Sequence, residues 1–514
     1  VPTTPWGFCR HSLQKPWGFY RRSLQKRWGL SYSFFMVVNE GQVAEAVRRD
    51  SPWWRSPHWA ATDRDMLEAA GSQIDYYPLS LANIRSGGLY MLYGPRRVGK
   101  TVLVKRSIQA LLAQGVNPLQ IIRVTVDGWQ ANRLGTLYEY VVRVLTSSVG
   151  DGPRYWFIDE VTACRGQWWS VVKNLRDNTH FGDDCVVLTG STNQDLDEAI
   201  KAFAGRRGPV DDPDRCLLPM NFGEFCHSLS IDLPSVAGLR ADGLMSARAR
   251  ETWMALAPYT DDLVAAWQTY LEVGGYPKAV GEWRRTNQVA VPTWQALWDV
   301  VRGDAITSGM NEVILGAVIN GIGVRLSSPT AISGFAEEVG VARETLMKRI
   351  DALASAFLVW RNPRADNSGN ADLRKQGKLY FLDPLVAKLP QLVNGRSQVD
   401  VTRLNEQQLG VALLQWNERV RPGSVRSGDW ITHYRNASSE VDFVGKCADL
   451  GTRMTPIEGK YVSDSWRQEA LGLRNSAIGT GILATRDILD ATEGEAVWAV
   501  PSSFLAFALS FSGK

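Results

Sequence analysis

Uninterrupted apolar runs and helical patterns alternate along the first half of the chain. The apolar runs predict buried strands, and the segments between them have the 3.6-residue spacing of helices. The predicted strands are residues 88–93, 120–126, 155–158, 185–189 and 215–219. The predicted helices include residues 102–112 and 134–147. Strands that alternate with helices in this way are typical of an α/β protein with a parallel sheet.

The second half of the chain has other patterns. Residues 236–320 are predicted to be mostly helical, with large apolar side chains at spacings that suit buried helix faces. These side chains are Trp253, Trp267, Leu271, Trp294 and Trp298. Residues 327–392 contain two helical patterns and then two strands around a polar loop, which is the order of a winged helix.

The 514 residues fit three or four domains of about 100–200 residues each. The predicted segments are a leader at 1–35, a helical lead-in at 36–85, the parallel-sheet domain at 86–235, a helical domain at 236–320, a winged helix at 321–392 and a final α/β domain at 393–514.

The first 35 residues contain an imperfect repeat. The segment 5–15 recurs at 16–26, and a partial third copy follows. Each copy contains a helix-weakening glycine and the first two also contain a proline, which argues against a coiled coil. We expect residues 1–35 to be a disordered leader, with Met36 as a candidate for the true start of translation.

The composition is that of a core-forming chain, with 45% hydrophobic and 21% charged residues. No run approaches the roughly 18 apolar residues that a membrane span requires. The six cysteines include no C-x-x-C pair and are too sparse for a disulfide scaffold. We therefore predict reduced thiols, a cytoplasmic location and no membrane association.

The formal net charge of +4 comes from the leader. Residues 1–35 carry six basic and no acidic side chains, so residues 36–514 have a net charge of −2. The body of the protein therefore has no bulk attraction for nucleic acid, and any such contact must depend on a local basic patch.

A glycine-bounded loop follows the first predicted strand. It matches G-x-x-x-x-G-K-[ST] between a strand and a helix, a pattern that turns backbone N–H groups toward a polyphosphate. The loop consists of Gly94, Pro95, Arg96, Arg97, Val98, Gly99, Lys100 and Thr101. We expect it to bind ATP, with Lys100 at the β- and γ-phosphates and the Thr101 hydroxyl on Mg²⁺.

Two acidic residues, Asp159 and Glu160, directly follow the apolar run at 155–158. We predict that Asp159 positions the metal together with Thr101, and that Glu160 polarises the attacking water. The alternative is an acidic pair that merely ends a strand and caps a helix. A further strand and helix separate this pair from the phosphate loop, which indicates the additional-strand, catalytic-glutamate class of P-loop ATPases.

Two other places supply candidate catalytic side chains. Ser191 and Asn193 follow the strand at 185–189, at the edge where parallel sheets bind ligands, and one of them is predicted to sense the γ-phosphate. Helix capping is the alternative role for both. Arg206 and Arg207 are candidates for an arginine that stabilises phosphoryl transfer, within the chain or across a subunit contact. Solvated loop arginines are the alternative.

With these motifs the chain resembles bacterial and archaeal AAA-type ATPases whose ATPase domain is joined to a C-terminal domain of unknown function with a nuclease-like fold. The resemblance covers roughly residues 50–510. Besides the phosphate loop and Asp159-Glu160, it rests on Gly190-Ser191, Gly205-Arg206, Tyr270-Leu271, Gly274-Gly275-Tyr276-Pro277, Lys378-Leu379-Tyr380-Phe381 with Asp383, Glu440-Val441-Asp442-Phe443-Val444 and Ile457-Glu458-Gly459-Lys460. It implies an AAA-type parallel sheet followed by a helical region, a winged helix and a restriction-endonuclease-like α/β domain.

The final domain resembles restriction-type nucleases in its D…E-x-K pattern. This resemblance implies that Asp442 and Glu458 bind Mg²⁺ and that Lys460 helps to activate water. The pattern usually includes a glutamate on a preceding helix, but alignment on Gly410 puts Leu414-Gln415 at the expected Glu-Asn. Residues 393–514 carry 13 basic and 14 acidic side chains, so they offer no patch for a polyanion. We expect a degenerate nuclease fold.

The predicted winged helix has nine basic and seven acidic residues between 327 and 392. Because the excess is small, a structural or protein-docking role is favoured over DNA binding. The basic residues that could meet phosphates are Arg343, Lys348, Arg349, Arg361, Arg364, Arg374, Lys375 and Lys378.

The sequence therefore predicts a Mg²⁺-dependent ATPase that acts as a switch or motor on an unknown protein or nucleic-acid partner. One alternative is a nucleic-acid enzyme whose active C-terminal nuclease is under ATPase control. The other is a nucleotide-binding switch that does not hydrolyse. ATP and Mg²⁺ are the predicted cofactors, and homo-oligomerisation stays open.

Overall fold

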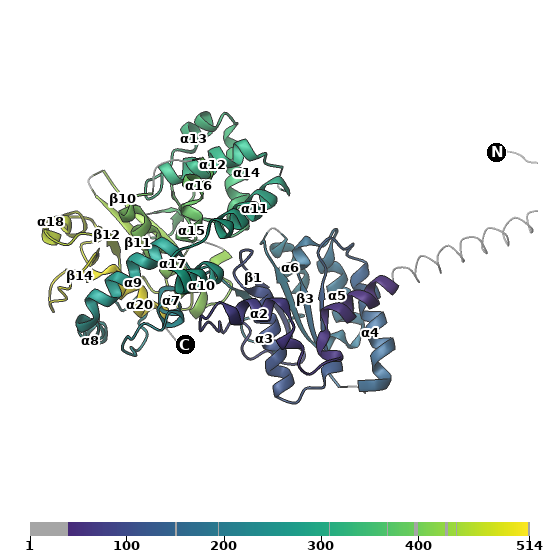
Figure 1. Ribbon diagram of the computed structural model, residues 1–514. Coiled ribbons are helices and arrows are strands. Elements are labelled where there is room, and N and C mark those ends of the chain that lie inside the picture. Colours follow the sequence, from purple (N-terminus) through teal and green to yellow (C-terminus); the bar gives the residue numbers. More distant parts are fainter. Residues whose placement is uncertain are drawn as a thin grey trace, which may run out of the picture.

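The computed structural model describes residues 40–149, 152–193, 195–307, 309–366, 369–394, 399–426, 430–437 and 439–511. The predicted leader at residues 1–35 lies outside the described residues. Figure 1 shows two lobes, one formed by the N-terminal part of the chain in purple and blue, the other by the remaining residues in teal, green and yellow.

A five-stranded parallel sheet forms the centre of the N-terminal lobe, with the strand order β2-β3-β4-β1-β5. The strands are β1 Leu89–Tyr93, β2 Ile121–Thr125, β3 Tyr155–Asp159, β4 Cys185–Gly190 and β5 Asp214–Cys216. Strand β4 lies between β1 and β3, so the phosphate-loop strand and the carboxylate strand are not neighbours in the sheet. The strand that separates them in the sequence, β2, lies at the edge of the sheet. The sheet is that of a P-loop NTPase.

Apolar side chains cover both faces of this sheet, which explains why its strands are continuous apolar runs. Along β1, Tyr90 and Leu92 enter the cluster packed against α3, whereas Met91 enters the larger core on the opposite face. The helices of this lobe are α2 Arg64–Gly71, α3 Lys100–Ala113, α4 Arg133–Val149, α5 Trp168–Asn178 and α6 Leu196–Phe203.

The segment before the sheet packs along its edge strand, β2. Residues 40–50 are helical, and short 3₁₀ helices follow at Pro52–Trp54 and Trp59–Ala61. The indole N–H groups of Trp53 and Trp54 both donate to the carbonyl oxygen of Ile121, each at 2.9 Å. The lead-in therefore covers an edge that would otherwise expose unpaired backbone groups.

The second lobe begins with helices that cover much of residues 222–324. These are α7 Phe222–Ser228, α8 Ala247–Leu256, α9 Thr260–Val273, α10 Pro277–Thr286, α11 Val291–Thr307 and α12 Glu312–Val324. Next come α13 Ile332–Val339, α14 Arg343–Ser355 and an antiparallel pair, β6 Val359–Asn362 with β9 Lys378–Phe381. The short helices α15 Pro384–Ala387 and α16 Leu389–Asn394 follow.

The C-terminal part of the second lobe contains a seven-stranded mixed sheet in the order β14-β13-β12-β11-β10-β7-β8. Its strands are β7 Arg364–Ala365, β8 Ala371–Asp372, β10 Ile431–Arg435, β11 Glu440–Gly445, β12 Ile457–Gly459, β13 Gly481–Thr485 and β14 Val497–Pro501. Its helices are α17 Val401–Val420, α18 Trp466–Glu469, α19 Leu471–Arg474 and α20 Ser502–Ser510. Strands β7 and β8 come from the segment predicted as a winged helix, so this segment extends the C-terminal sheet.

The remaining short 3₁₀ helices are Pro118–Gln120, Val161–Ala163, His180–Gly182, Ala257–Tyr259 and Ser424–Arg426. Among the described residues, none of the helices combines the length and the hydropathy that crossing a membrane would need. The cysteines in the described ranges are buried free thiols: Cys164, Cys185, Cys216, Cys226 and Cys447.

The Gly274-Gly275 turn between α9 and α10 has a packing role. Gly274 has a φ of 76°, and a Cβ there would lie 2.2 Å from Asp383 Oδ1. A Cβ on Gly275 would lie 2.4 Å from the carbonyl oxygen of Met220, and the Gly275 N–H donates to Asp383 Oδ2 at 2.7 Å. The turn therefore joins the segment after the parallel sheet to the start of α15, and only glycine fits there.

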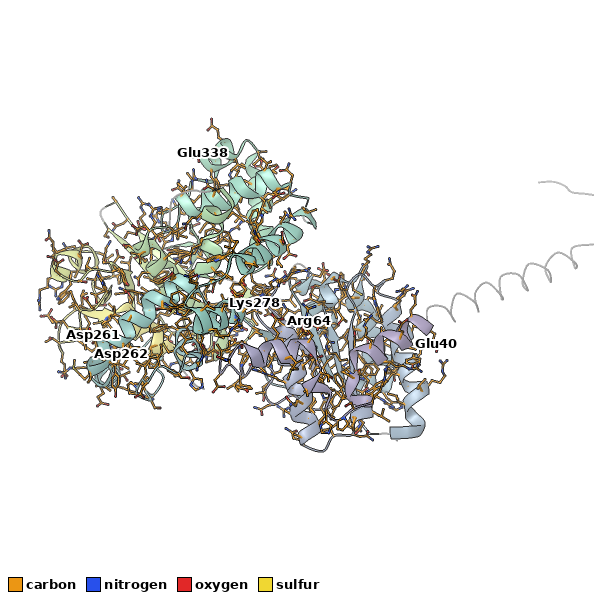
Figure 2. The ribbon with its side chains drawn as sticks, in the orientation of Figure 1. Glu40, Arg64, Asp261, Asp262, Lys278 and Glu338 are labelled. Carbon is orange, nitrogen blue, oxygen red and sulfur yellow. The ribbon has the colours of Figure 1, made fainter. Side chains whose placement is uncertain are left out.

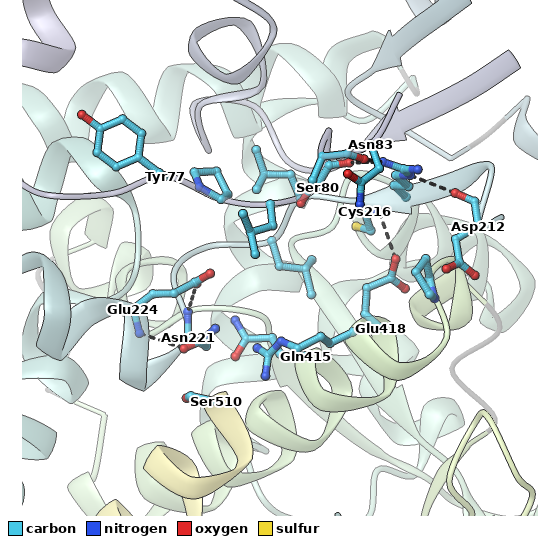
Figure 3. A pocket seen from close by; sticks show the side chains of 18 of the residues that line it. Tyr77, Ser80, Asn83, Asp212, Cys216, Asn221, Glu224, Gln415, Glu418 and Ser510 are labelled. Carbon is cyan, nitrogen blue, oxygen red and sulfur yellow. Dashed lines mark hydrogen bonds between the residues drawn. The ribbon is translucent and has the colours of Figure 1, made fainter. Parts of the chain in front are cut away.

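Helix α17 contacts the N-terminal lobe through a buried carboxylate. A cavity of about 1160 Å³ lies between residues 76–85, residues 211–224 and α17, and Figure 3 shows side chains that line it. Beside it, Glu418 accepts hydrogen bonds from the backbone N–H groups of Cys216, Gly423 and Val425, at 2.9, 2.7 and 3.1 Å. Burial raises the pKa of Glu418 to about 7, although these three donors oppose the shift.

This contact predicts a pH-dependent stability. Because the raised pKa of Glu418 exceeds the value of 4.5 for an exposed glutamate, the unfolded chain loses this proton first. Its contribution is complete below about pH 4.5 and is lost as the pH rises through about 7. We predict that Glu418→Gln removes this pH-dependent loss. As the pH rises from about 5 to about 8, the unfolding free energy of the variant minus that of wild type should therefore increase by up to about 3 kcal/mol. Urea unfolding followed by tryptophan fluorescence measures this, and parallel pH profiles would contradict it.

Candidate functional site

The predicted phosphate loop connects the carboxyl end of β1 to the start of α3. Gly94 and Gly99 have φ values of 148° and 103°, a backbone region that disfavours side chains. A Cβ on Gly94 would lie 2.1 Å from the carbonyl oxygen of Leu217, so the loop passes close to the segment after β5. The loop therefore has the tight conformation that its glycines predicted, at the edge where parallel sheets bind ligands.

The Lys100 side chain folds back over this loop. Its ammonium group donates to the carbonyl oxygens of Gly94 and Pro95 at 2.8 and 3.0 Å. Burial lowers the pKa of Lys100, while the nearby carboxylates of Glu160 and Asp159 act in the opposite direction. The loop thus holds a buried cation that is bonded to backbone groups and faces two carboxylates.

Asp159, at the end of β3, is held by three side chains. Its Oδ2 accepts from the Arg123 guanidinium at 2.7 Å and from the Thr101 hydroxyl at 3.2 Å. The Thr189 hydroxyl donates to its Oδ1. Burial acts to raise the pKa of Asp159, but Arg123 and Thr189 outweigh burial and hold this pKa below its usual range. The carboxylate is therefore ionised and fixed beside Thr101.

Sequence reasoning missed Arg123 and Thr189. Arg123 is a charged residue inside the apolar run at 121–126, and a buried charge in a strand requires a partner. That signal could have identified it. Thr189 offered no comparable signal, because threonine is common in strands.

Glu160 has an unusual backbone and an unpartnered oxygen. Its φ is 61°, which is costly for a residue with a side chain, and its N–H donates to Thr189 Oγ1 at 3.0 Å. Its Oε2 is buried and has no hydrogen-bond partner among the described residues. Thr189 therefore links the Asp159 side chain to the Glu160 backbone and fixes the direction of both acids.

Lys100, Thr101 and Glu160 line one cavity of about 670 Å³, which we call the loop cavity, whereas Asp159 is buried behind Thr101 and does not line it. Its polar wall is formed by Arg96, Arg97, Lys100, Thr101 and Glu160. Its other walls come from α2, residues 74–78, α10 and α11. The Lys278 ammonium on α10, labelled in Figure 2, lies 3.4 Å from the Glu68 carboxylate on α2. The cavity is therefore enclosed by parts of both lobes.

Helix α11 reaches the phosphate loop through an ion pair. Arg96 Nε lies 3.1 Å from Asp304 Oδ1. Burial raises the pKa of Asp304, and Arg96 opposes this shift. This contact between the loop and the second lobe was not predicted, because nothing in the spacing of residues 291–307 indicates which loop the helix meets.

The candidate sensor residues lie beside the loop cavity but do not line it. Ser191 is buried, and its N–H donates to Thr162 Oγ1 at 3.3 Å. The Asn193 N–H donates to the carbonyl oxygen of Ser355, at the end of α14, at 2.9 Å. Asn193 lines a different cavity of about 980 Å³, together with α14 and the residues before β9.

Arg206 and Arg207 lie at the opposite edge of the sheet from the phosphate loop. The Leu89 N–H, at the amino end of β1, donates to the carbonyl oxygen of Arg207 at 3.0 Å. The guanidinium of Arg206 is 2.6 Å from Asp177, and that of Arg207 is 2.6 Å from Asp214. The structure therefore does not bring either arginine to the loop cavity of its own chain.

The three candidate nuclease residues are close together in the second lobe. The Asp442 N–H donates to Glu458 Oε2 at 3.1 Å, and Lys460 Nζ lies 2.9 Å from Glu458 Oε1. A further carboxylate, Glu406, comes from α17, two helical turns before Leu414. Glu406 reaches this cluster through Lys378, whose Nζ lies 3.0 Å from Glu406 Oε1 and 2.6 Å from Asp442 Oδ1.

Basic residues of the segment predicted as a winged helix are engaged within the protein. Arg361 pairs with Asp351 at 2.7 Å, and Arg374 pairs with Asp372 at 3.0 Å. Lys378 is buried. These pairs leave less positive charge for phosphates than the sequence count suggests.

Comparison with known proteins assigns the first part of the chain. Residues 86–226 match the family model of an AAA domain. Residues 264–391 match a second model, described as a domain of unknown function (DUF8612). An uncharacterized protein of Haemophilus influenzae is 22% identical over 369 residues, which is 70% of this chain and 80% of that protein.

Two structures of RuvB variants from Thermotoga maritima are also similar to this chain. They have 16% and 14% sequence identity and TM-scores of 0.23 and 0.24. The matches cover 54% and 62% of this chain, and 82% and 93% of the RuvB chains. Because these TM-scores are low, they support no inference about this protein. The family match, the parallel sheet and the phosphate loop together identify residues 86–226 as an AAA domain of the P-loop type.

Proposed function

We propose that the protein binds ATP with Mg²⁺ in the loop cavity and hydrolyses it. The observation that carries this proposal is the combination of groups beside the phosphate loop. A buried ammonium, a fixed carboxylate–hydroxyl pair and an unpartnered carboxylate oxygen all lie at the phosphate loop. Few other reactions need a cation, a metal-binding pair and a base at the same glycine-rich loop.

The residues present fit a metal-bound triphosphate. The Thr101 hydroxyl and the ionised Asp159 are hard oxygen donors that lie 3.2 Å apart, and they would hold Mg²⁺. Bound Mg²⁺ supplies charge neutralisation at the β- and γ-phosphates. Lys100 would exchange its two backbone carbonyl acceptors for phosphate oxygens, and Glu160 would hold and polarise a water molecule through its unpartnered oxygen.

The remainder of the loop cavity suits a nucleoside. Its volume of about 670 Å³ lies within the range of about 300–1,000 Å³ that is common for small-molecule sites. Apolar side chains also line this cavity, among them Ile74, Pro78 and Val102. These contacts support a base-binding wall formed by the lead-in and α3.

We further propose that the nucleotide state is transmitted to the second lobe. Two contacts lead from the phosphate edge into this lobe, the Arg96–Asp304 ion pair and the hydrogen bond from Asn193 to Ser355. A phosphate that draws Arg96 toward the loop would compete with Asp304 for the same guanidinium. The proposed function is therefore an ATP-driven switch. The ion-paired basic residues Arg361 and Arg374 and the net charge of −2 over residues 36–514 favour a protein partner over nucleic acid.

Phosphate release tests the hydrolysis. We predict Mg²⁺-dependent release of phosphate from ATP by the wild-type protein and a loss of at least about 100-fold in Lys100→Ala, since that variant lacks the cation at the transferred phosphate. Lys201→Ala, which removes an exposed lysine of α6, is the matched control and should retain wild-type activity. Parallel assays with DNA, RNA and cell extract identify the partner class by stimulation. Equal release by wild type and Lys100→Ala would refute the proposal.

A further inference from the structure

A buried ammonium group lies among three carboxylates in the second lobe. Lys378 Nζ lies 2.6 Å from Asp442 Oδ1, 2.8 Å from Glu440 Oε1 and 3.0 Å from Glu406 Oε1. Its side chain is only 1% exposed. The ammonium group donates hydrogen bonds to Glu406 and Asp442 and forms an ion pair with Glu440. Lys378 therefore fills the space between these acids.

The surrounding hydrogen bonds fix the acids in place. Asp442 Oδ2 accepts from the Gly459 N–H at 2.9 Å, and the Tyr380 hydroxyl donates to Glu406 Oε1 at 2.5 Å. Glu458 accepts a hydrogen bond from the Asp442 N–H and forms an ion pair with Lys460. The cluster thus consists of three carboxylates around Lys378, of which Glu440 is partly exposed, and of Glu458, which pairs with Lys460 beside them.

The cation and the acids come from different parts of the chain. Lys378 begins β9, whereas Glu406 is on α17 and Asp442 is on β11. Two further bonds hold β9 and β6 in this position. The Phe381 N–H donates to the Gln407 side chain at 3.1 Å, and the Asn362 amide donates to the Asp442 carbonyl oxygen at 3.0 Å. Lys378 is therefore held in place by the hydrogen bonds around β9 as well as by its ion pairs.

A neutral histidine lies within electrostatic range of the same ammonium. His433 is fully buried, and its Nδ1 is 3.1 Å from the carbonyl oxygen of Asn362, so this nitrogen carries the proton. Its Nε2 has no hydrogen-bond partner among the described residues. Burial, and next the charge of Lys378, lower the pKa of His433 to about 4. An unprotonated imidazole nitrogen is a common metal ligand, and the hydrogen bonds of this cluster do not involve Nε2 of His433.

We propose that Lys378 occupies, within the same chain, the position that a divalent cation would take among Asp442, Glu406 and Glu440. Hard divalent cations prefer carboxylate oxygens at about 2.0–2.6 Å, and the same oxygens here surround an ammonium at hydrogen-bond distances. The lysine therefore excludes the metal and keeps the cluster without hydrolytic chemistry. This inference does not depend on ATP binding at the loop cavity.

The charges explain why the exclusion is stable. Three carboxylates within 3.0 Å of Lys378 Nζ stabilise its positive charge. A metal ion could enter only if the ammonium left, and the β9 contacts hold it there. In the wild-type protein the ammonium group thus neutralises the carboxylates in place of a metal ion. Removal of the ammonium should leave carboxylates that recruit a cation from solution.

Manganese binding to the nucleotide-free protein tests the proposal, with electron paramagnetic resonance to measure free Mn²⁺. We expect no Asp442-dependent Mn²⁺ site in wild type and one new site in Lys378→Met, bound at least about tenfold more tightly than any wild-type site. The double variant Lys378→Met/Asp442→Asn should lose it. Lys375→Met, which removes an exposed lysine of the preceding turn, is the matched control and should behave as wild type.

Thermal unfolding provides a second readout. Mn²⁺ should raise the melting temperature of Lys378→Met more than that of wild type, because only the variant gains the Asp442-dependent site. If Lys378→Met does not fold, Lys378→Gln, which leaves all three carboxylates in place, is used instead. Wild-type Mn²⁺ binding that Asp442→Asn abolishes would overturn the proposal. A folded lysine variant without a new site would overturn it as well.

Discussion

Glu160→Gln should abolish steady-state ATP hydrolysis and leave ATP binding intact. The substitution keeps the size of the side chain and removes its ability to accept a proton from water. General-base catalysis contributes about 10²–10⁴-fold, so we expect a fall of at least about 100-fold in kcat. The contacts of Lys100, Thr101 and the loop N–H groups do not involve the Glu160 side chain, so the dissociation constant for ATP should stay close to that of wild type. Phosphate release and calorimetric titration measure the two quantities separately.

The matched control is Glu251→Gln, which changes an exposed glutamate of α8 far from the phosphate loop. It should leave both quantities unchanged. A Glu160→Gln protein that releases phosphate at the wild-type rate would show that another group activates the water. One that no longer binds ATP would show that Glu160 is needed for the architecture of the loop cavity.

Arg123→Met should destabilise the AAA domain more than any surface substitution. Arg123 and Asp159 form a buried ion pair at 2.7 Å, and both side chains are less than 10% exposed. Removal of one partner from a buried pair typically costs about 3–5 kcal/mol, because the other charge stays buried without compensation. We expect a loss of this size in the unfolding free energy, measured by urea unfolding with tryptophan fluorescence. Hydrolysis should also fall, since Asp159 is then no longer held beside Thr101.

The double variant Arg123→Met/Asp159→Asn separates charge from packing. Because it removes both charges, it should recover much of the lost stability while it stays inactive. Arg248→Met, on the exposed surface of α8, is the control and should change stability by less than about 0.5 kcal/mol. If Arg123→Met is as stable as wild type, the ion pair does not fix Asp159 in the way described here.

The sequence contained enough to predict the parallel sheet and the phosphate loop, because both depend on local rules. Apolar runs followed by helical patterns identify buried parallel strands, and the loop motif specifies its own turn. The sequence places β2 between the phosphate-loop strand and the carboxylate strand, whereas in the sheet it is β4 that lies between them. Local patterns do not report which helix of a later segment meets the loop. The Arg96–Asp304 contact could therefore not be predicted from the sequence.

Arg206 lies in the segment between α6 and β5, at the amino edge of the sheet and opposite the phosphate loop. Because a parallel sheet places the residues before a strand at that edge, the predicted strand at 215–219 already argued against Arg206. The limit of local patterns does explain the outcome at Glu406. Glu406 belongs to a long helix with many buried polar residues, where spacing does not identify the turn that faces Asp442. The role of Lys378 depends on three segments that are distant in sequence. A single sequence contains no local pattern that predicts such a contact.

The most direct test of the central claim is calorimetric titration of the folded wild-type protein with Mg²⁺ and ATP. We predict saturable heat with about one site per chain, and its loss in Lys100→Ala at unchanged thermal stability. Heat that is absent from wild type, or that persists unchanged in Lys100→Ala, would contradict the account.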